Sequence, residues 1–416
     1  IIADNTFVKD GLYVSESYAN VVNDNFVNGK PLIYLEGVAD HVVENAGQVV
    51  LVNCSGVRVE ELELSNTTVG VELWMTRKSV ITGNSMASNT LGSIWILDSS
   101  NNIIDGNSIT SNSIGHCIWL SSSSDNSVTR NNITANGGIG ISVSASSNNN
   151  ITRNTVTANS GAGIDLHSSS ANNYITENDI ERNYDGISVS SSTNNVSDNN
   201  IAANFRYGIG LCLSSSGNIV TRNNVTGNED GICLVASSNG NTVTKNNIAN
   251  NSVGLGLISS SNNVLKGNVM TANKYNFGVE GSALSDFMND VDVTNTVDGK
   301  RVYYWISKQD QTVPLDAGYV AAINATNLIV ENLNLRNNIQ GVLFAYTNNS
   351  SIQNVTATGN SYGVWCEFAA NITMSGSQML RNTGDGIWLQ YSSGACISGN
   401  NIASNEGFGM VCGTVR

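Results

Sequence analysis

Residues 221–241 read TRNNVTGNEDGICLVASSNGN, and closely similar stretches occupy residues 129–150, 152–173, 176–195 and 244–263. Each copy holds an Asn-x-φ-x-x-Asn motif, in which φ is apolar, followed by a turn, a short apolar run and a segment of Ser and Asn. Self-similarity at a fixed period of 20–50 residues is typical of solenoids. The chain is therefore expected to be built from stacked copies of one structural unit.

The asparagine motif recurs nine times without a break, at intervals of 21–24 residues. Asn adopts left-handed backbone readily and bonds neighbouring backbone in tight turns, and stacked amides can bond to each other. We therefore interpret the column as a structural ladder rather than a ligand site. Its members are Asn84, Asn107, Asn131, Asn154, Asn178, Asn199, Asn223, Asn246 and Asn268.

The apolar run that follows each turn alternates with polar or small residues, as in Ile187 and Val189 or Ile232 and Leu234. A period of two indicates a strand with one buried face. Helical periodicity and helix caps are lacking, which excludes leucine-rich repeats. The pattern predicts an all-β protein, a parallel β-helix of about 23 residues per coil, with coils spaced by about 4.8 Å.

A second level of repetition relates residues 28–73 to residues 298–344, which match almost throughout. We call each of these segments a cassette. A long run of regular coils follows the first cassette, and about three follow the second. This predicts a β-helix over residues 1–289 and a continuation over residues 290–416.

The first cassette, with GKPLIYL at 29–35 and AGQVVLVNCSGVRVEELELSN at 46–66, resembles NosD-like domains. These are right-handed β-helices of the carbohydrate-binding and sugar-hydrolase type, found in archaeal surface and sheath proteins. The resemblance covers essentially the whole chain. It implies a right-handed solenoid and leaves function open, because β-helices serve as lyases, hydrolases, binders and scaffolds.

The formal net charge is −14, and only 12% of residues are charged. This disfavours a nucleic-acid or anionic-membrane partner, since Lys and Arg hold both. No apolar run reaches the roughly 20 residues of a membrane helix. Glycosylation sequons predict an extracellular or cell-surface location, with candidates at Asn66, Asn132, Asn150, Asn195, Asn224 and Asn349.

Recognisable catalytic motifs are missing, since Asn-Thr-Asp, Gly-His-Gly and Arg-Ile-Lys of polygalacturonase-like β-helices do not occur. The best catalytic set is Asp165, His167 and Asp185, whereas the plain interpretation of Asp185 is turn chemistry. Copper sites favour His, Cys and Met. His116 and Cys117 come nearest to such a site but lack a third soft ligand in register. We therefore expect no enzyme, metal or cofactor.

Strand parity places Cys117, Cys212 and Cys233 on the outer face, where thiols oxidise or cross-link. An intrachain Cys212–Cys233 bridge, an intermolecular bridge and an unpaired thiol all stay open. The same parity predicts exposed indoles at Trp95, Trp119, Trp365 and Trp388, which suit sugar stacking or a protein interface.

Three functions compete. The leading hypothesis is an extracellular structural protein that assembles with itself, head to tail, into a surface layer, sheath or filament, because the first and last coils carry no caps. The alternative is a β-helix that binds or cleaves carbohydrate with glycans as partners. A NosD-like, copper-related accessory protein is the third.

Overall fold

The computed structural model describes residues 1–413. Its internal contacts divide the chain into two units, Ile1–Ile209 and Gly210–Arg416. The boundary expected at 289/290 thus lies inside the second unit. In a solenoid each coil contacts only its neighbours, so such a division follows chain length rather than a change of fold.

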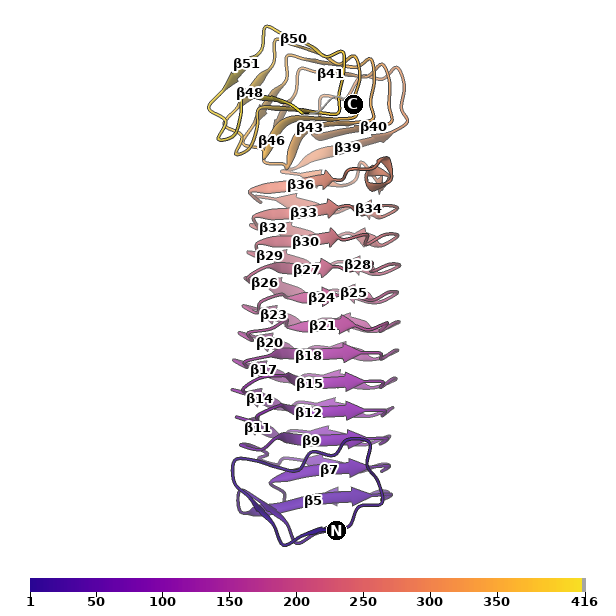
Figure 1. Cartoon of the computed structure of the whole chain (residues 1–416), viewed down its shortest axis with the longest axis vertical. Coiled ribbons are helices and arrows are strands. Elements are labelled where there is room, and N and C mark those ends of the chain that lie inside the picture. Colours follow the sequence, from indigo (N-terminus) through magenta and orange to yellow (C-terminus); the bar gives the residue numbers. More distant parts are fainter. Residues whose placement is uncertain (414–416) are drawn as a thin grey trace. The chain divides into compact units, whose positions relative to one another are not determined.

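Three parallel sheets form most of the first unit (Figure 1). From residue 69 onward each coil adds one strand to each sheet, whereas the two coils before it add none to the third sheet. The front sheet contains β5 (Lys30–Glu36), β7 (Gln48–Val52), β9 (Val69–Trp74), β12 (Gly92–Leu97), β15 (His116–Ser121), β18 (Ile139–Ser144), β21 (Ile164–His167) and β24 (Ile187–Val189). The second sheet contains β6 (Val42–Val43), β8 (Arg58–Glu60), β10 (Val80–Thr82), β13 (Ile103–Asp105), β16 (Ser127–Thr129), β19 (Asn150–Thr152), β22 (Tyr174–Thr176) and β25 (Asn195–Ser197). The third sheet contains β11 (Ser85–Ala87), β14 (Ser108–Thr110), β17 (Asn132–Thr134), β20 (Thr155–Thr157), β23 (Asp179–Glu181) and β26 (Asn200–Ala202).

The alternating pattern explains the core of the first unit. Ile94, Ile118 and Ile141 are partners in adjacent strands and have no exposed surface. Burial of such aliphatic side chains contributes about 1.5–3 kcal/mol each. The predicted fold class, an all-β parallel β-helix, is confirmed.

Asparagine columns run through the bends between sheets. Nδ2 of Asn107 donates to Oδ1 of Asn131 at 2.9 Å and to the carbonyl of Ile81 at 2.9 Å. Oδ1 of Asn107 accepts from the backbone and side-chain nitrogens of Asn84, both at 3.0 Å. The amide of Asn107 thus makes four hydrogen bonds while only 1% exposed, so its burial leaves no unmet polar atom.

Each cassette begins with a hairpin. Strands β4 (Phe26–Val27) and β5 are antiparallel, and Asn28 and Gly29 between them have φ of 50° and 81°. The second hairpin joins β38 (Thr296–Val297) to β39 (Lys300–Ile306) through Asp298 and Gly299, with φ of 46° and 78°. Asn-Gly and Asp-Gly are the preferred pairs for such turns, because both central residues need positive φ.

A segment without strands, Asp10–Asn20, precedes the first hairpin, and we call it the strap. Two short parallel pairs flank it, β1 (Ile2–Ala3) with β3 (Val22–Asn23), and β2 (Thr6–Phe7) with β4. The chain therefore enters and leaves the strap through hydrogen-bonded strands.

The second unit also consists of parallel coils, and β27 (Tyr207–Leu211) lies at its start. Its first coils contain β28 (Ile219–Thr221), β29 (Asn224–Thr226), β30 (Asp230–Val235), β31 (Thr242–Thr244), β32 (Asn247–Ala249), β33 (Val253–Ile258), β34 (Val264–Lys266), β35 (Val269–Thr271), β36 (Tyr275–Glu280) and β37 (Asp290–Val291), with the 3-10 helix η1 (Leu284–Phe287). The second cassette and its coils contain β39, β40 (Ala317–Ile323), β41 (Ile329–Glu331), β42 (Asn334–Arg336), β43 (Gln340–Ala345), β44 (Ser351–Gln353), β45 (Thr356–Thr358), β46 (Tyr362–Glu367), β47 (Thr373–Ser375), β48 (Gln378–Leu380), β49 (Ile387–Gln390), β50 (Cys396–Ser398), β51 (Asn401–Ala403) and β52 (Met410–Cys412).

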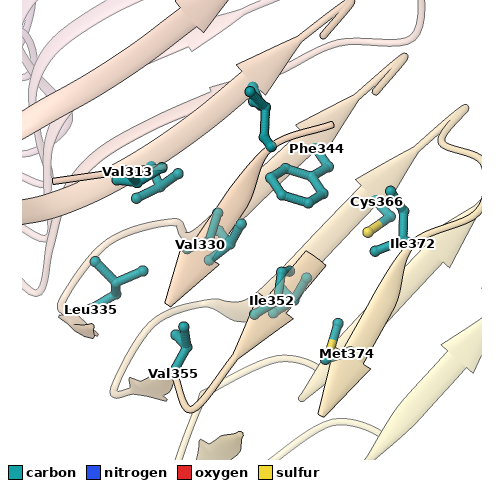
Figure 2. Close-up of a cluster of buried hydrophobic side chains, with 14 of the residues drawn as sticks. Val313, Val330, Leu335, Phe344, Ile352, Val355, Cys366, Ile372 and Met374 are labelled. Carbon is teal, nitrogen blue, oxygen red and sulfur yellow. The ribbon is translucent and has the colours of Figure 1, made fainter. Parts of the chain in front are cut away.

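Apolar side chains from successive coils fill the interior of the second cassette. Figure 2 shows Phe344, Ile352 and Met374 among the buried residues that face this core. All three have no exposed surface. Within residues 1–413 no helix is long and apolar enough to cross a membrane. Of the six sequon asparagines, five lie exposed and Asn195 is half-buried.

Candidate functional site

One row of side chains on the outer side of each unit, which we call the outer column, contains the four candidate tryptophans and Asp165. Strand register defines it in the first unit as Tyr34, Val50, Glu72, Trp95, Trp119, Ser142, Asp165 and Ser188. In the second unit the column is Tyr304, Ala321, Leu343, Trp365, Trp388 and Val411.

The two outer columns carry tryptophan at the same places. Counted from the first long strand of each cassette, Trp95 and Trp365 stand fourth, and Trp119 and Trp388 stand fifth. Each column begins with a tyrosine, Tyr34 or Tyr304. The duplication of the cassette therefore extends to a pair of indoles in adjacent coils.

In the second unit the two indoles form a stacked pair. The ring centroids of Trp365 and Trp388 lie 5.8 Å apart with an interplanar angle of 29°. Their Nε1 atoms donate to Oε2 of Glu367 at 3.1 Å and to Oε1 of Gln390 at 3.0 Å. Tyr362 packs against both rings. Both indoles are half-buried, so one aromatic surface lies beside a carboxylate and an amide.

In the first unit the indoles meet edge to face. The centroids of Trp95 and Trp119 are 5.0 Å apart at 85°, and Tyr13 of the strap contacts Trp95 edge-on at 5.4 Å. Trp95 is only 8% exposed, so the prediction of an exposed indole is wrong at this position, because the strap covers it. Trp119 is half-buried and lies 5.4 Å from the ring of His116.

Beyond Trp119 the column becomes polar. Asp165 and His167 lie on β21, with Oδ2 and Nε2 3.9 Å apart. Oγ of Ser142, one coil earlier, is 3.3 Å from the same His167 nitrogen. Burial raises the pKa of Asp165, although a hydrogen bond from Ser188 and the nearby imidazole oppose the rise. A carboxyl of this kind beside an imidazole can exchange a proton with a bound molecule.

Asp185, the third member of the expected catalytic set, does not join this pair. Its carboxylate receives two bonds from Arg206, at 2.9 and 2.6 Å, and a third from the backbone nitrogen of Tyr207. Its side chain is 6% exposed. Sequence reasoning missed Arg206, which lies over the rings of Tyr184 and Tyr207. The acidic turn at Asp185 is thus an internal ion pair.

Two of the three cysteines expected on the surface are buried. The Cys117 thiol contacts the side chain of Asn112. Ser93 and Gly140, at the same place in the neighbouring coils, are buried as well. Cys233 is 3% exposed and pairs with Gly256 of the next coil. Cys212 is half-buried. The alternation of side chains along a strand does not predict that neighbouring residues bury these thiols. Cys396 and Cys412 are exposed.

Comparison with known proteins identifies the family. A model described as "Right handed beta helix region" matches residues 11–180, and one described as "Periplasmic copper-binding protein (NosD)" matches residues 162–309 and 306–413. The second match covers more than half of the chain. The chain belongs to the NosD family. No curated protein matches it.

Several solved structures are similar to this NosD-family chain. An exopolygalacturonase from Thermotoga maritima is 12% identical with a TM-score of 0.43, covering 48% of this chain and 54% of its own. The periplasmic alginate epimerase AlgG is 16% identical with a TM-score of 0.42, covering 88% of this chain and 78% of its own. The A-module of mannuronan C-5 epimerase AlgE4 from Azotobacter vinelandii is 12% identical, with a TM-score of 0.39 and coverages of 89% and 91%. The chain therefore matches about half the length of the exopolygalacturonase.

The family description names copper, which is held in proteins by His, Cys and Met side chains. Within residues 1–413 no three His, Cys, Asp or Glu side chains come together in a way that could hold one metal ion. His116 lies beside Trp119, whereas the Cys117 thiol faces Asn112. Burial raises the pKa of Cys117 to about 12, so the thiol stays protonated and is a poor ligand. The described residues do not fit a copper site.

Proposed function

We propose that this chain is a carbohydrate-binding β-helix of the cell envelope or extracellular space. It holds a polysaccharide against the outer columns, with Trp119 and the indole pair Trp365/Trp388 as stacking surfaces. The observation that carries the proposal is the placement of tryptophan at the fourth and fifth positions of both outer columns.

Indole suits this role because it combines a large apolar face with a polar N–H. Sugar rings present the same combination, apolar C–H faces and polar rims. Glu367 and Gln390 supply acceptors beside the stacked pair. Hydroxyl and carboxyl groups of Ser142, Asp165 and Ser188 follow Trp119 along the column. Binding sites of this kind combine apolar walls with a few placed polar groups.

The binding experiment uses a panel of neutral and acidic polysaccharides in affinity electrophoresis and calorimetry. We expect Trp119→Ala, Trp365→Ala and Trp388→Ala each to weaken binding about tenfold, which corresponds to about 1.4 kcal/mol. Tyr174→Ala is the matched control, since this exposed ring lies in the second sheet on β22. Failure to bind any polysaccharide, or equal affinity in the indole variants and the control, would refute the proposal.

A second candidate function, modification of the bound chain, is favoured by the 3.9 Å approach of Asp165 to His167. Asp165→Asn and His167→Ala would then abolish turnover while the polysaccharide stays bound. Hydrolysis by two carboxyl groups lacks a second acid here, because Asp185 is held by Arg206.

Assembly of the chain with itself into a sheath remains a prediction without a comparable observation. An extracellular or envelope location accords with the periplasmic location named in the family description. We therefore prefer the carbohydrate hypothesis to the structural one.

A further inference from the structure

The strap is attached to the front sheet by side chains rather than by strand pairing. Gln48 binds both backbone groups of Leu12, with Leu12 N to Oε1 at 2.8 Å and Nε2 to Leu12 O at 2.6 Å. Oε2 of Glu72 accepts from Val14 N at 3.2 Å. The carboxylate of Glu36 accepts from the backbone nitrogens of Ala19 and Asn20.

Apolar and aromatic contacts complete the attachment. Val14 is 6% exposed and packs with Val50, Val52 and Trp74 in one buried cluster, against which Leu12 also packs. Tyr13 meets Trp95 edge-on, and Tyr18 stacks on Trp74 with centroids 5.4 Å apart at 14°. Tyr13 and Tyr18 are themselves 43% and 65% exposed. The strap therefore covers two indoles and is anchored by one small apolar cluster, while its own tyrosine rings face solvent.

The second cassette differs at this point. Strand register makes Tyr362 the counterpart of Gly92, so in that cassette the ring against the indoles belongs to the strand itself. The covering segment there includes η1, whose Phe287 is fully buried and accepts a hydrogen bond from Tyr304. In the first unit the ring against Trp95 is Tyr13 of the strap, so it would move away from Trp95 if the strap were displaced.

We infer that the strap is a displaceable cover. The surface beneath it, formed by Tyr34, Glu72, Trp74 and Trp95, is a cryptic extension of the outer column that receives further sugar units of the same polysaccharide. This inference rests on the proposed function. A lifted strap lengthens the aromatic surface from Trp119 to Trp95 and Trp74, and it releases Gln48 and the carboxylate of Glu72 to bind sugar hydroxyls.

Glu72 makes the cover sensitive to pH. Its carboxyl has no exposed surface, and Oε1 has no hydrogen-bond partner among the described residues. Burial raises the pKa of Glu72 from 4.5 to about 8. Burial is the main cause of this shift, and the hydrogen bond from the backbone nitrogen of Val14 opposes it. The strap carries Asp10 and Glu16 but no Lys or Arg, so it brings no cation to an ionised Glu72.

The direction follows from linkage. A carboxyl that stays protonated only under the strap favours the docked strap at low pH. Between pH 4.5 and about 8, each unit of pH weakens docking up to tenfold, since one pKa unit is a tenfold change in an equilibrium constant. Above about pH 8 the free-energy cost of docking the strap over Glu72 no longer changes. The strap is therefore lifted most often at alkaline pH.

Glu16, in the middle of the strap, provides a cleavage site for a glutamate-specific protease. We expect cleavage after Glu16 in the intact chain to accelerate about tenfold or more from pH 6 to 8. Glu72→Gln cannot ionise, so it should show a flat profile at the same protease activity. Equal profiles in the parent and Glu72→Gln would overturn the assigned trigger.

Affinity tests the cryptic site. The double variant Tyr13→Ala/Tyr18→Ala should bind polysaccharide several-fold more tightly, because apparent affinity scales with the fraction of molecules whose strap is lifted. Tyr174→Ala should bind like the parent. Unchanged or weaker binding by the double variant would overturn the cover. If no polysaccharide binds to any variant, the proposed function fails, whereas the protease profile still reports on the strap.

Discussion

Asn131 and Asn132 are neighbours in sequence with opposite surroundings. Asn131 is 1% exposed, accepts from the backbone and side chain of Asn107 and donates to Asn154, whereas Asn132 lies exposed on β17. Removing the Asn131 amide leaves two buried donors of Asn107 without an acceptor. Each unmet group costs about 1–3 kcal/mol.

We therefore expect Asn131→Ala to lower the free energy of unfolding by at least about 2 kcal/mol. Asn132→Ala should stay within about 0.5 kcal/mol, as exposed substitutions do. Urea unfolding followed by circular dichroism measures both. Equal losses in the two variants would mean that the ladder amides contribute no more than surface asparagines.

At the scale of residues, the sequence predicts the asparagine ladder, which recurs from coil to coil, and misses contacts that single side chains make. The ladder asparagines are found by counting, because each has a counterpart in the next coil. Arg206 has none, and its pairing with Asp185 depends on a side chain that reaches across coils. The burial of Cys117 is shared by Ser93 and Gly140 at the same place in the neighbouring coils. The alternation of outer and inner side chains therefore does not extend to this end of the strand.

At the scale of elements, the two hairpins that open the cassettes depend on glycine. Gly29 has a φ of 81°, which L-residues with a Cβ adopt at a cost of about 1–2 kcal/mol. We expect Gly29→Ala to lower stability by that amount and Gly299→Ala, at a φ of 78°, to do the same. Gly29→Asn serves as the control in thermal unfolding, because Asn adopts positive φ at a smaller cost than Ala. Loss of stability in the control alone would contradict this account.

The strands of the regular coils are predictable because a period of two decides which side chains are buried. The strap is not, since its sequence, DGLYVSESYAN at 10–20, lacks any period. Its position depends on Gln48, Glu72 and Glu36, which lie 16 to 58 residues away along the chain. The alternation of residues along one strand therefore could not predict that the strap covers Trp95.

At the scale of the whole chain, stability should fall as pH rises from about 5 to 8. Burial raises the pKa values of Glu72, Asp165, Glu280 and Glu367. Below their ordinary values both folded and unfolded forms are protonated. Above these values the unfolded chain releases protons that the folded chain retains, so folding is disfavoured.

We expect the urea midpoint to decline over this range, with a loss on the order of 1–3 kcal/mol from Glu72. Glu72→Gln should decline less. A rising midpoint, or identical slopes in parent and variant, would contradict the prediction. Lifting of the strap limits the loss, because it hydrates Glu72 before the coils unfold.

The spacing of the asparagine columns has a consequence for how the chain finds its fold. Ladder partners are 23 or 24 residues apart from Asn84 to Asn178, then 21 residues apart at Asn178 and Asn199, and 27 apart at Asn268 and Asn295. If all coils were identical, a strand could pair with the strand of the wrong coil during folding at almost no cost in free energy. Unequal rungs make such a slip leave loops too short or too long to close. The coils of unequal length thus fix the register in which successive strands pair during folding.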